Sequence, residues 1–493
     1  MKKILTSTIF SIFILTSSQS KTIQVTNPGN NKDIQPAISS ALRIALDGDI
    51  LSIPEGIFIF NKNIVVTKTI SLKGAGIGKT ILYRSESVPD SILTNSDIWN
   101  EMFYYNINKT TPSNISVTGI TFRSKNPSKV KGDGGSLASD VGIRFFHCAD
   151  FVVAYCRFEY FGNAAIAILH TDTIARGLIC KNQFYRNAKG FDGLGLGYGV
   201  VVYGDNNKWV PNPKFGSNNF IFIENNTFDY HRHAIAAGGC GLYVARYNTI
   251  TNNIIAQDNS THAIDAHEAR GGKLGNGNYF STRAIEAYDN TIINTTFYDG
   301  ATILPGQKVN RLIERAIAIR GGEAIVRGNV IKGYRFGMSV GVAVFPWGTT
   351  YPLPYSPGYI SGSALGANHS GTNVSQGNGD AFFWGNKFTP YDNLPESNVF
   401  YNYDPSHFVR GRDYHVQAKP GYVPYTYPHP HTLIADCTTD INKDGITSNT
   451  DLLLLLSKFG QACVSCTYDV NKDGSISNAD LMLILSCFDQ PCR

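Results

Sequence analysis

The sequence has little charge and no long hydrophobic run. Asp, Glu, Lys and Arg make up 16% of the 493 residues, against about 25% in an ordinary soluble domain. This argues against a helical bundle, a coiled coil or a charge-rich disordered chain. No segment beyond the N-terminus approaches the roughly 18 uninterrupted apolar residues of a membrane span. The net charge of +5 comes without a basic run, so nucleic acid is not an expected partner.

The N-terminus carries the features of an export signal. Lys2 and Lys3 precede an apolar stretch over residues 9–15, and small residues follow up to Ser20, which is the order found in secretory signal peptides. We therefore expect residues 1–20 to be removed, and the mature protein to be secreted, extracellular or at the cell surface, where disulfides are permitted. An anchoring N-terminal helix is the alternative, but the apolar stretch is too short to span a bilayer.

A repeated triplet organises the middle of the chain. Asn-x-(Phe/Ile) ends short β-branched runs at residues 182–184, 226–228, 248–250, 290–292 and 329–331. Successive copies are 44, 22, 42 and 39 residues apart, near one or two coils of about 21 residues, and a fixed period in this range indicates a solenoid. The Leu framework of a leucine-rich repeat is missing, whereas Asn at turns and stacked Ile, Val or Phe suit a parallel β-helix.

Features at both ends of this repeat add a family resemblance. Residues 33–46 have apolar side chains at helical spacing, ended by Gly48-Asp49 and Pro54-Glu55-Gly56, and a Tyr/Pro/His-rich run closes the region at residues 413–430. Residues 22–433 thus resemble secreted β-helix proteins of the pectin-lyase-like superfold. The resemblance implies an all-β, right-handed parallel β-helix solenoid with an N-terminal helical cap. That superfold hosts lyases, hydrolases, esterases and non-catalytic spikes, so it does not determine the reaction.

The chain divides into regions of different composition. We place the β-helix at residues 21–345 and an irregular, Pro- and Tyr-rich C-terminal part of the same domain at residues 346–435. Residues 436–493 form a separate module with a net charge of −4. After loss of the leader the rest of the chain carries +7.

The C-terminal module contains an acidic loop that occurs twice, 29 residues apart. Oxygen side chains at loop positions one, three, five and nine, Gly at six and a carboxylate at twelve suit a hard cation with six or seven oxygen ligands. We expect two Ca²⁺ ions, with Ile446 and Ser475 contributing backbone carbonyls. The predicted ligands are Asp440, Asn442, Asp444, Ile446, Ser448 and Asp451 in the first loop and Asp469, Asn471, Asp473, Ser475, Ser477 and Asp480 in the second.

Each loop leads into an apolar helix, at residues 452–459 and 481–488, without a convincing entering helix. This arrangement, with Asp rather than Glu at loop position twelve, resembles the dockerin type I module. The resemblance implies a small α-helical calcium-loop domain that docks a partner such as a cohesin-like protein. A calcium-stabilised end cap or sorting tag is the alternative, and calcium would offset the acidic charge of either.

The nine cysteines are an odd number, so at least one is unpaired within the monomer. Four tail cysteines obey the 29-residue offset, namely Cys437, Cys463, Cys466 and Cys492. They predict the bridges Cys437–Cys463 and Cys466–Cys492, or a crossed arrangement, and leave Cys487 as the unpaired tail thiol. Buried free thiols and bridges are equally expected for the cysteines of the β-helix, which are Cys148, Cys156, Cys180 and Cys240.

A second repeated element, (His/Arg)-Ala-Ile, locates a candidate active groove. It occurs at residues 233–235, 262–264, 283–285 and 315–317. If each Ile points inward, polar residues of the same strands point outward. Neighbouring coils lie about 4.8 Å apart, so these side chains should form a column on one open face. The predicted catalytic residues are Asp265, His267, Glu286, Tyr288 and Arg320.

These side chains suit two reactions on polysaccharide. In a glycoside hydrolase, Asp265 and Glu286 would divide the nucleophile and acid roles. In a lyase, His267 or Tyr288 would remove the proton beside a uronic acid carboxylate, and Arg320 or a calcium ion would neutralise that carboxylate. The positive charge of the β-helix favours an acidic polysaccharide. A non-catalytic adhesin or carbohydrate-binding protein on the same fold is the alternative function.

The residues that start these strands are expected to be structural. His233, His262, Arg283 and Arg315 should form a stacked polar ladder rather than a ligand set. His262 and His267 are five residues apart on a strand, so they face opposite sides and cannot chelate zinc together. Neither the Asp pattern of polygalacturonases nor the calcium cluster of pectate lyases is found in register, so no catalytic residue is carried over from those enzymes.

Overall fold

The computed structural model describes most of the chain. The described residues are 20–89, 99–107, 114–125, 139–170, 174–187, 196–204, 212–252, 261–267, 282–295, 299–302, 308–310, 315–340, 381–391, 395, 399–402, 410–411, 413–432, 438–442, 446–463, 466–488 and 490–491. Residues 1–19 of the predicted leader therefore lie outside the described residues, as do all of residues 346–380. Within the described part of the chain, no helix has the length and apolar character needed to cross a membrane.

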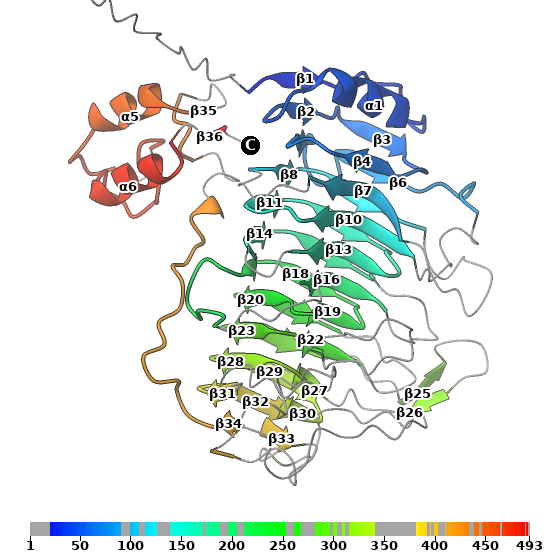
Figure 1. The fold of residues 1–493 in the computed structure, drawn as a ribbon, viewed down its shortest axis with the longest axis vertical. Coiled ribbons are helices and arrows are strands. Elements are labelled where there is room, and N and C mark those ends of the chain that lie inside the picture. The colour runs from blue at the N-terminus through cyan, green and yellow to red at the C-terminus, as the bar shows by residue number, and fades with distance from the viewer. Residues whose placement is uncertain are drawn as a thin grey trace, which may run out of the picture.

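Three long parallel sheets build the main body, and the chain visits them in turn on every coil (Figure 1). Sheet 1 comprises β1 (Thr22–Gln24), β2 (Ile50–Ser52), β5 (Ser71–Lys73), β8 (Ser116–Thr118), β11 (Phe151–Ala154), β14 (Gly177–Cys180), β17 (Ile221–Glu224), β20 (Leu242–Arg246), β23 (Ala284–Tyr288), β28 (Glu323–Arg327), β31 (Ala381–Trp384) and β34 (Tyr414–His415). Sheet 2 comprises β3 (Gly56–Ile59), β6 (Thr80–Tyr83), β9 (Thr121–Arg123), β12 (Arg157–Glu159), β15 (Gln183–Tyr185), β18 (Thr227–Asp229), β21 (Thr249–Thr251), β24 (Thr291–Ile293), β29 (Val330–Tyr334) and β32 (Lys387–Pro390). Sheet 3 comprises β4 (Ile64–Val66), β7 (Asn100–Asn106), β10 (Asp140–Phe146), β13 (Ala164–Leu169), β16 (Tyr198–Tyr203), β19 (His233–Gly238), β22 (His262–Ala266), β27 (Arg315–Ile319), β30 (Phe336–Val340) and β33 (Phe400–Asn402).

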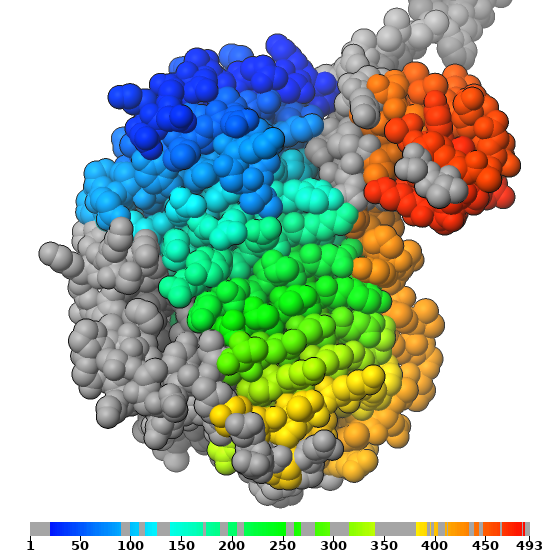
Figure 2. Space-filling view, turned by 180° about the vertical axis from the view of Figure 1, so that it is seen from behind, coloured from blue at the N-terminus to red at the C-terminus, as the bar shows by residue number. Residues whose placement is uncertain are grey.

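This topology is a parallel β-helix, as the repeat predicts. Helix α1 (Gln35–Ile44) covers its N-terminal end and buries Ile38 and Ala41, which confirms the expected cap. A hairpin of β25 (Asp299–Thr302) and β26 (Lys308–Asn310) lies outside the three sheets. In the space-filling view the coils form parallel bands (Figure 2).

The Asn triplets mark the turn from sheet 1 to sheet 2. The residue before each Asn has a positive φ, for example 55° at Asn225 and Tyr247, and the buried Asn follows it. Asn248 Oδ1 accepts hydrogen bonds from the backbone N–H of Asn226 at 3.0 Å and from its Nδ2 at 3.1 Å. The ladder repeats this contact on each coil, because a buried turn must pair its backbone groups. The members are Asn182, Asn226, Asn248, Asn290, Asn329 and Asn386.

Stacked apolar rows fill the interior. In sheet 2, Phe122, Phe158, Phe184 and Phe228 stack with ring centroids 5.0, 5.3 and 4.5 Å apart in succession. In sheet 3, the inward row is Ile143, Ile166, Val200, Ile235, Ile264 and Ile317. Successive coils pair in the same register, so like side chains lie above one another. Each side chain of a row is buried by its neighbours in the coils before and after it.

A C-terminal strap, residues 416–432, crosses the outer face of sheet 1 (orange in Figure 1). That face is apolar, with Val152, Leu178, Phe222 and Val244 forming a second cluster against which Tyr425 packs. The strap has no regular strand or helix over residues 416–430. Strands β31 to β34 continue the three sheets to His415, beyond the boundary expected at residue 345. The strap that follows covers one face of the β-helix.

The C-terminal module contains α5 (Asn449–Leu456), α6 (Asn478–Ser486) and the short pair β35 (Ile446–Thr447) and β36 (Gln490–Pro491). Its own small core consists of Ile441, Leu455, Val470, Ile476 and Ile484. Both helices begin three residues earlier than predicted. Ser448 and Ser477 close capping boxes with Asp451 and Asp480, which start each helix inside its loop.

The predicted disulfide pairing is wrong. Cys463 bonds to Cys466, three residues further along the chain, with 5.9 Å between their Cα atoms. Cys437 and Cys492 lie outside the described residues. Cys148, Cys156 and Cys180 are buried free thiols in the β-helix, and burial raises the pKa of Cys148 and Cys156 to about 12, so these thiols are unreactive. Cys240 and Cys487 are buried too.

Candidate functional site

The long connections of the chain flank sheet 3. Turns from sheet 1 to sheet 2 are two residues long at Lys181-Asn182, whereas residues 124–139 and 186–197 lead into sheet 3 and residues 267–283 leave it. Loops on a rigid scaffold are where binding and catalytic groups concentrate. The outer face of sheet 3 is therefore the place to look for function.

Asp265 and Arg320 form a buried, two-pronged ion pair on this face. Arg320 Nε donates to Asp265 Oδ1 at 2.9 Å and Nη2 donates to Oδ2 at 2.6 Å, and the two residues are 0% and 3% exposed. In register, Asp265 lies between Ala236 and Ala318. Burial alone would raise the pKa of Asp265, but the charge and hydrogen bonds of Arg320 outweigh it and lower the pKa below its usual value. Asp265 is thus held ionised and fixes the orientation of the guanidinium.

His267 stands beside this pair. It follows Asp265 by two residues, and Ala266 between them points into the core, so both side chains are on the outer face. The backbone N–H of His267 donates to Ala237 O, and that of Arg320 donates to Ala266 O, both at 2.9 Å. These bonds set His267 between Gly238 and Arg320. It is half-buried, so the structure brings three predicted site residues, Asp265, His267 and Arg320, to one place.

The prediction that Glu286 and Tyr288 share this face is wrong. Both belong to β23 in sheet 1, which pairs with β20 and β28 and not with β22. The 21 residues from Ile264 to Ile285 equal one coil, but here residues 267–283 form one long connection to the next sheet. Ile285 points into the same core as Ile264. Strands of sheet 1 and sheet 3 therefore carry the same (His/Arg)-Ala-Ile pattern, and residue spacing alone does not tell the two sheets apart.

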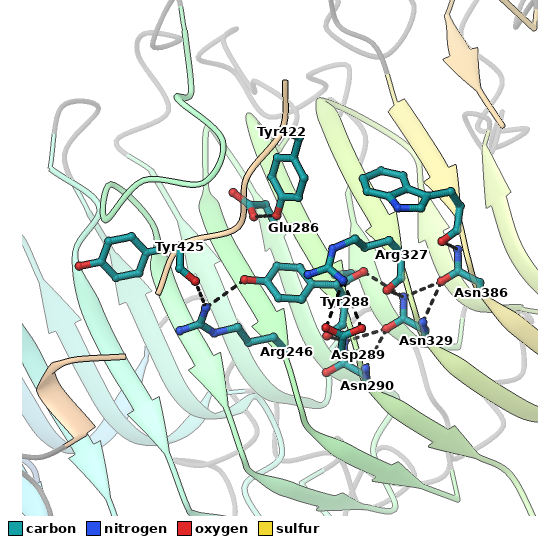
Figure 3. Close-up of polar contacts among 12 residues, drawn as sticks. Arg246, Glu286, Tyr288, Asp289, Asn290, Arg327, Asn329, Asn386, Tyr422 and Tyr425 are labelled. Carbon is teal, nitrogen blue, oxygen red and sulfur yellow. Dashed lines mark hydrogen bonds and ion pairs between the residues drawn. The ribbon is translucent and has the colours of Figure 1, made fainter. Parts of the chain in front are cut away.

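Glu286 lies beneath the strap, as Figure 3 shows. Its carboxylate accepts hydrogen bonds from the Tyr422 hydroxyl and, at 2.7 Å, from the Gly216 N–H. Burial raises the pKa of Glu286, with the two hydrogen bonds acting against it. Glu286 is 0% exposed and is covered by the strap through Tyr422.

Tyr288 and Arg246 complete this buried cluster (Figure 3). Arg246 Nη1 donates to the Tyr288 hydroxyl at 3.0 Å and to the strap carbonyl of Tyr425 at 2.7 Å. Arg246 also forms an ion pair with Glu224 at 2.6 Å, in which both side chains are 0% exposed. Burial raises the pKa of Tyr288 to about 12, so it stays protonated at neutral pH. These groups fasten the strap to sheet 1.

The histidine ladder is confirmed in part. The rings of Tyr198 and His233 stack 5.7 Å apart, and those of His233 and His262 stack 5.1 Å apart. His233 Nε2 lies 3.9 Å from Asp265 Oδ2. Burial and neighbouring arginines hold the pKa of His233 well below its usual range, so it is neutral. Arg283, however, pairs with Glu323 in sheet 1 at 3.0 Å, so it is not a member of this stack.

The sequence reasoning missed an aromatic group farther along the same face. Arg144 on β10 lies over the ring of Trp99, with its guanidinium carbon 4.4 Å from the ring centroid. Trp99 in turn lies 6.3 Å from Tyr203 on β16. All three side chains are half-buried. Trp99 stands just before β7, outside the repeated pattern, and periodicity therefore gave no signal for it.

The second acidic loop of the tail brings carboxylates together. One oxygen each from Asp469, Asp473 and Asp480 lies within 4.8 Å of the others. Asp480 Oδ1 also accepts from the Asn471 N–H at 3.0 Å, and Asp451 Oδ1 accepts from the Asn442 N–H at the same distance in the first loop. The two loops thus share this hydrogen bond. Asp444 of the first loop lies outside the described residues.

The architecture and this face define the class, a parallel β-helix protein with a polar and aromatic strip on one sheet. No protein-family model matches the chain, and no curated protein matches it. Among solved structures it is similar to an alginate lyase from Paenibacillus sp. strain FPU-7, with 13% identity, 77% of this chain and 99% of the other covered, and a TM-score of 0.33. It is also similar to the catalytic domain of a GH87 α-1,3-glucanase in complex with nigerose, with 14% identity, 82% of this chain and 68% of the other covered, and a TM-score of 0.35. A pectin methylesterase from Erwinia chrysanthemi is similar too, with 10% identity, 83% of this chain and 92% of the other covered, and a TM-score of 0.28.

Proposed function

We propose that the protein is a secreted lyase of acidic polysaccharide, with its site on the outer face of sheet 3. One observation carries the proposal: the half-buried His267 imidazole lies beside a guanidinium, Arg320, that is held in place by Asp265. A base next to a fixed cation is the combination that proton abstraction beside a carboxylate requires.

The reaction we propose is β-elimination on a uronic acid residue. Arg320 would neutralise the sugar carboxylate and so acidify the adjacent C5 proton. His267 would take that proton, the electron pair would form the C4–C5 double bond, and the C4–O glycosidic bond would break. The leaving oxygen would be protonated by water or by the protonated His267. Asp265 is a positioning residue here, because its ionised carboxylate keeps Arg320 in one orientation.

The geometry gives less support to a glycoside hydrolase. Such enzymes use two carboxyl groups about 5 to 9.5 Å apart, one of them with a raised pKa. Asp265 has a lowered pKa and is engaged by Arg320, and Glu286 is on another sheet beneath the strap. The buried Glu101 lies on β7, five strand spacings from β22 in sheet 3, or about 24 Å.

The tail belongs to the same proposal as a calcium-binding attachment module. Asp469, Asp473 and Asp480 offer the clustered oxygens that Ca²⁺ prefers, and the matching bonds of Asp451 support a second ion in the first loop. Calcium would offset the acidic charge and hold the small module together. We propose a cohesin-like protein as its docking partner, on the basis of the dockerin resemblance.

Turnover tests the lyase proposal. The purified protein is incubated with alginate, polygalacturonate and neutral glucans, and the absorbance of unsaturated products is followed alongside reducing ends. We expect unsaturated products from an acidic polymer, a loss of at least about a hundredfold in kcat for His267→Ala, and a raised KM for Arg320→Lys. Glu286→Gln is the control and should keep full activity. Binding without turnover would favour the non-catalytic alternative, and full activity in His267→Ala would refute the assignment.

A further inference from the structure

We infer that Trp99, Arg144 and Tyr203 form a second subsite, which binds the carboxylate and ring face of a uronic acid residue remote from His267. We call this group the distal platform. The inference rests on the proposed function in one respect, the acidic polysaccharide as ligand. It goes beyond that function by assigning a binding site and a minimum length of substrate.

Arg144 is presented in the same way as Arg320. Arg144 Nη1 donates to Glu101 Oε1 at 3.0 Å, and the Glu101 side chain is only 4% exposed, so a buried acid again fixes a guanidinium. Arg144 Nε is buried and has no hydrogen-bond partner among the described residues. Guanidinium offers five N–H groups in a planar fork that fits a carboxylate. Because Nε is enclosed, an anion would meet the Nη groups of Arg144.

The aromatic rings provide the apolar part of the platform. The Arg144 guanidinium lies 4.4 Å from the Trp99 centroid and 5.0 Å from the Tyr104 centroid. Tyr203 borders Trp99 on the other side at 6.3 Å. The half-buried indole carries the guanidinium over its ring, and the rest of its surface is apolar with polar groups at the edge. A pyranose ring, with C–H groups on one face and hydroxyl or carboxylate groups around it, matches that surface.

The platform and the catalytic group lie along one row of the outer face of sheet 3, which we call the track. In register the outer row runs through Arg144, Ala167, Val201, Ala236, Asp265 and Ala318. Ala167, Val201 and Ala236, which lie between Arg144 and Asp265, are at most 2% exposed, and Trp99 and Tyr203 pack against their cluster. Gly238 lies between Tyr203 and His267, and a Cβ there would be 3.4 Å from the Tyr203 ring. From β10 to β27 there are five strand spacings, or about 24 Å. Since a pyranose residue of an extended chain advances by close to one spacing, about five residues would reach both cations.

The free-energy contribution of the platform should therefore depend on ligand length. A dimer can fill only the sites around His267 and Arg320, whereas a hexamer can also reach Arg144. The track predicts a step in affinity between short and long oligouronates. A neutral oligosaccharide would gain the aromatic contact but not the charge-assisted hydrogen bonds, so its step should be smaller.

Calorimetry with the full chain tests the platform, using alginate and galacturonate oligosaccharides from dimer to hexamer as probes. Trp99→Ala and Arg144→Gln should each raise the Kd of the hexamer about tenfold, a loss of about 1.4 kcal/mol, and leave the Kd of the dimer unchanged. Arg186→Gln is the matched control, because Arg186 lies 4.9 Å from the ring of Tyr230 in a similar stack away from this track. Unchanged thermal midpoints confirm that the variants are folded.

The outcomes separate the two proposals. Weakened hexamer binding in both variants supports the platform, whether or not the wild type turns over any polymer. If the wild type turns over a polymer but Trp99→Ala and Arg144→Gln bind the hexamer as tightly as the wild type does, the platform is refuted and the lyase proposal stands. No binding of any oligouronate by the wild type, or an equal effect of Arg186→Gln, also overturns the platform.

Discussion

Replacing Arg246 with methionine should release the strap from sheet 1 while the coils stay folded. Arg246 donates to two strap carbonyls, Tyr425 O at 2.7 Å and Thr426 O at 2.8 Å. It also neutralises Glu224, whose carboxylate accepts from the strap N–H of His429 at 3.0 Å. One side chain therefore joins the sheet, a buried acid and the strap.

The magnitude follows from burial. Both side chains of the Arg246–Glu224 pair are 0% exposed, and removing one partner of a buried pair costs about 3 to 5 kcal/mol, because the other charge stays buried without compensation. The double variant Arg246→Met with Glu224→Gln should cost less than Arg246→Met alone, since no unpaired charge is then left in the interface.

Hydrogen exchange is the suitable assay, because the strap can open without global unfolding. Peptides covering residues 421–432 should exchange roughly a hundredfold to several thousandfold faster in Arg246→Met, at about 1.4 kcal/mol per tenfold. Arg327→Met is the control. Its pair with Asp289 at 3.2 Å is partly exposed, so it should cost no more than about 1 kcal/mol. Equal strap protection in Arg246→Met and the wild type would refute the reasoning.

Three further outcomes are expected. Burial raises the pKa of Glu286, so its contribution to stability is largest below the unfolded-state pKa and falls as pH rises through the folded-state pKa. Glu286→Gln should therefore remove the pH dependence of the hydrogen-exchange rate of the strap over that window. An unchanged pH profile would contradict this. Asn248→Ala should cost about 2 to 4 kcal/mol in chemical denaturation, because it leaves the Asn226 N–H unpaired, whereas the exposed Thr249→Ala should cost under 1 kcal/mol. Calorimetry with Ca²⁺ should show two sites in the wild type and no binding in the double variant Asp440→Ala with Asp469→Ala. Chelation should lower the thermal stability of the tail alone. Binding that persists in the double variant would argue against both loops.

Most of the fold could be predicted because the sequence repeat follows directly from the stacking of successive coils. Each Asn at the turn must pair with the next Asn, and each Phe or Ile after it must stack on its counterpart, so the triplet recurs wherever a coil closes. The cap at residues 35–44 was predictable for a similar reason, since its apolar spacing reflects one buried face.

The candidate site could be predicted only by half. Asp265, His267 and Arg320 lie on or next to β22 and β27, which pair directly. The alternation of side chains along a strand was therefore enough to bring them together. Glu286 could not be placed, because the 21 residues from Ile264 to Ile285 match the length of a full coil but lead only to the next sheet. Trp99 and Arg144 meet through a connection and a strand from different coils, and a contact of that kind leaves no periodic signal. The Cys463–Cys466 bond was missed because the internal duplication suggested symmetric bridges, whereas the bond joins two cysteines only three residues apart.

The strap also determines how the molecule would carry mechanical load. If the tail is held by a partner while the body is held by a bound polymer, tension enters the body through residue 432. The first contacts to bear it are those of Thr432 and His429 with Glu224, on a sheet other than the one that carries the proposed groove. The strap could then peel away from sheet 1 residue by residue and absorb extension, while the strands around His267 remain unstressed.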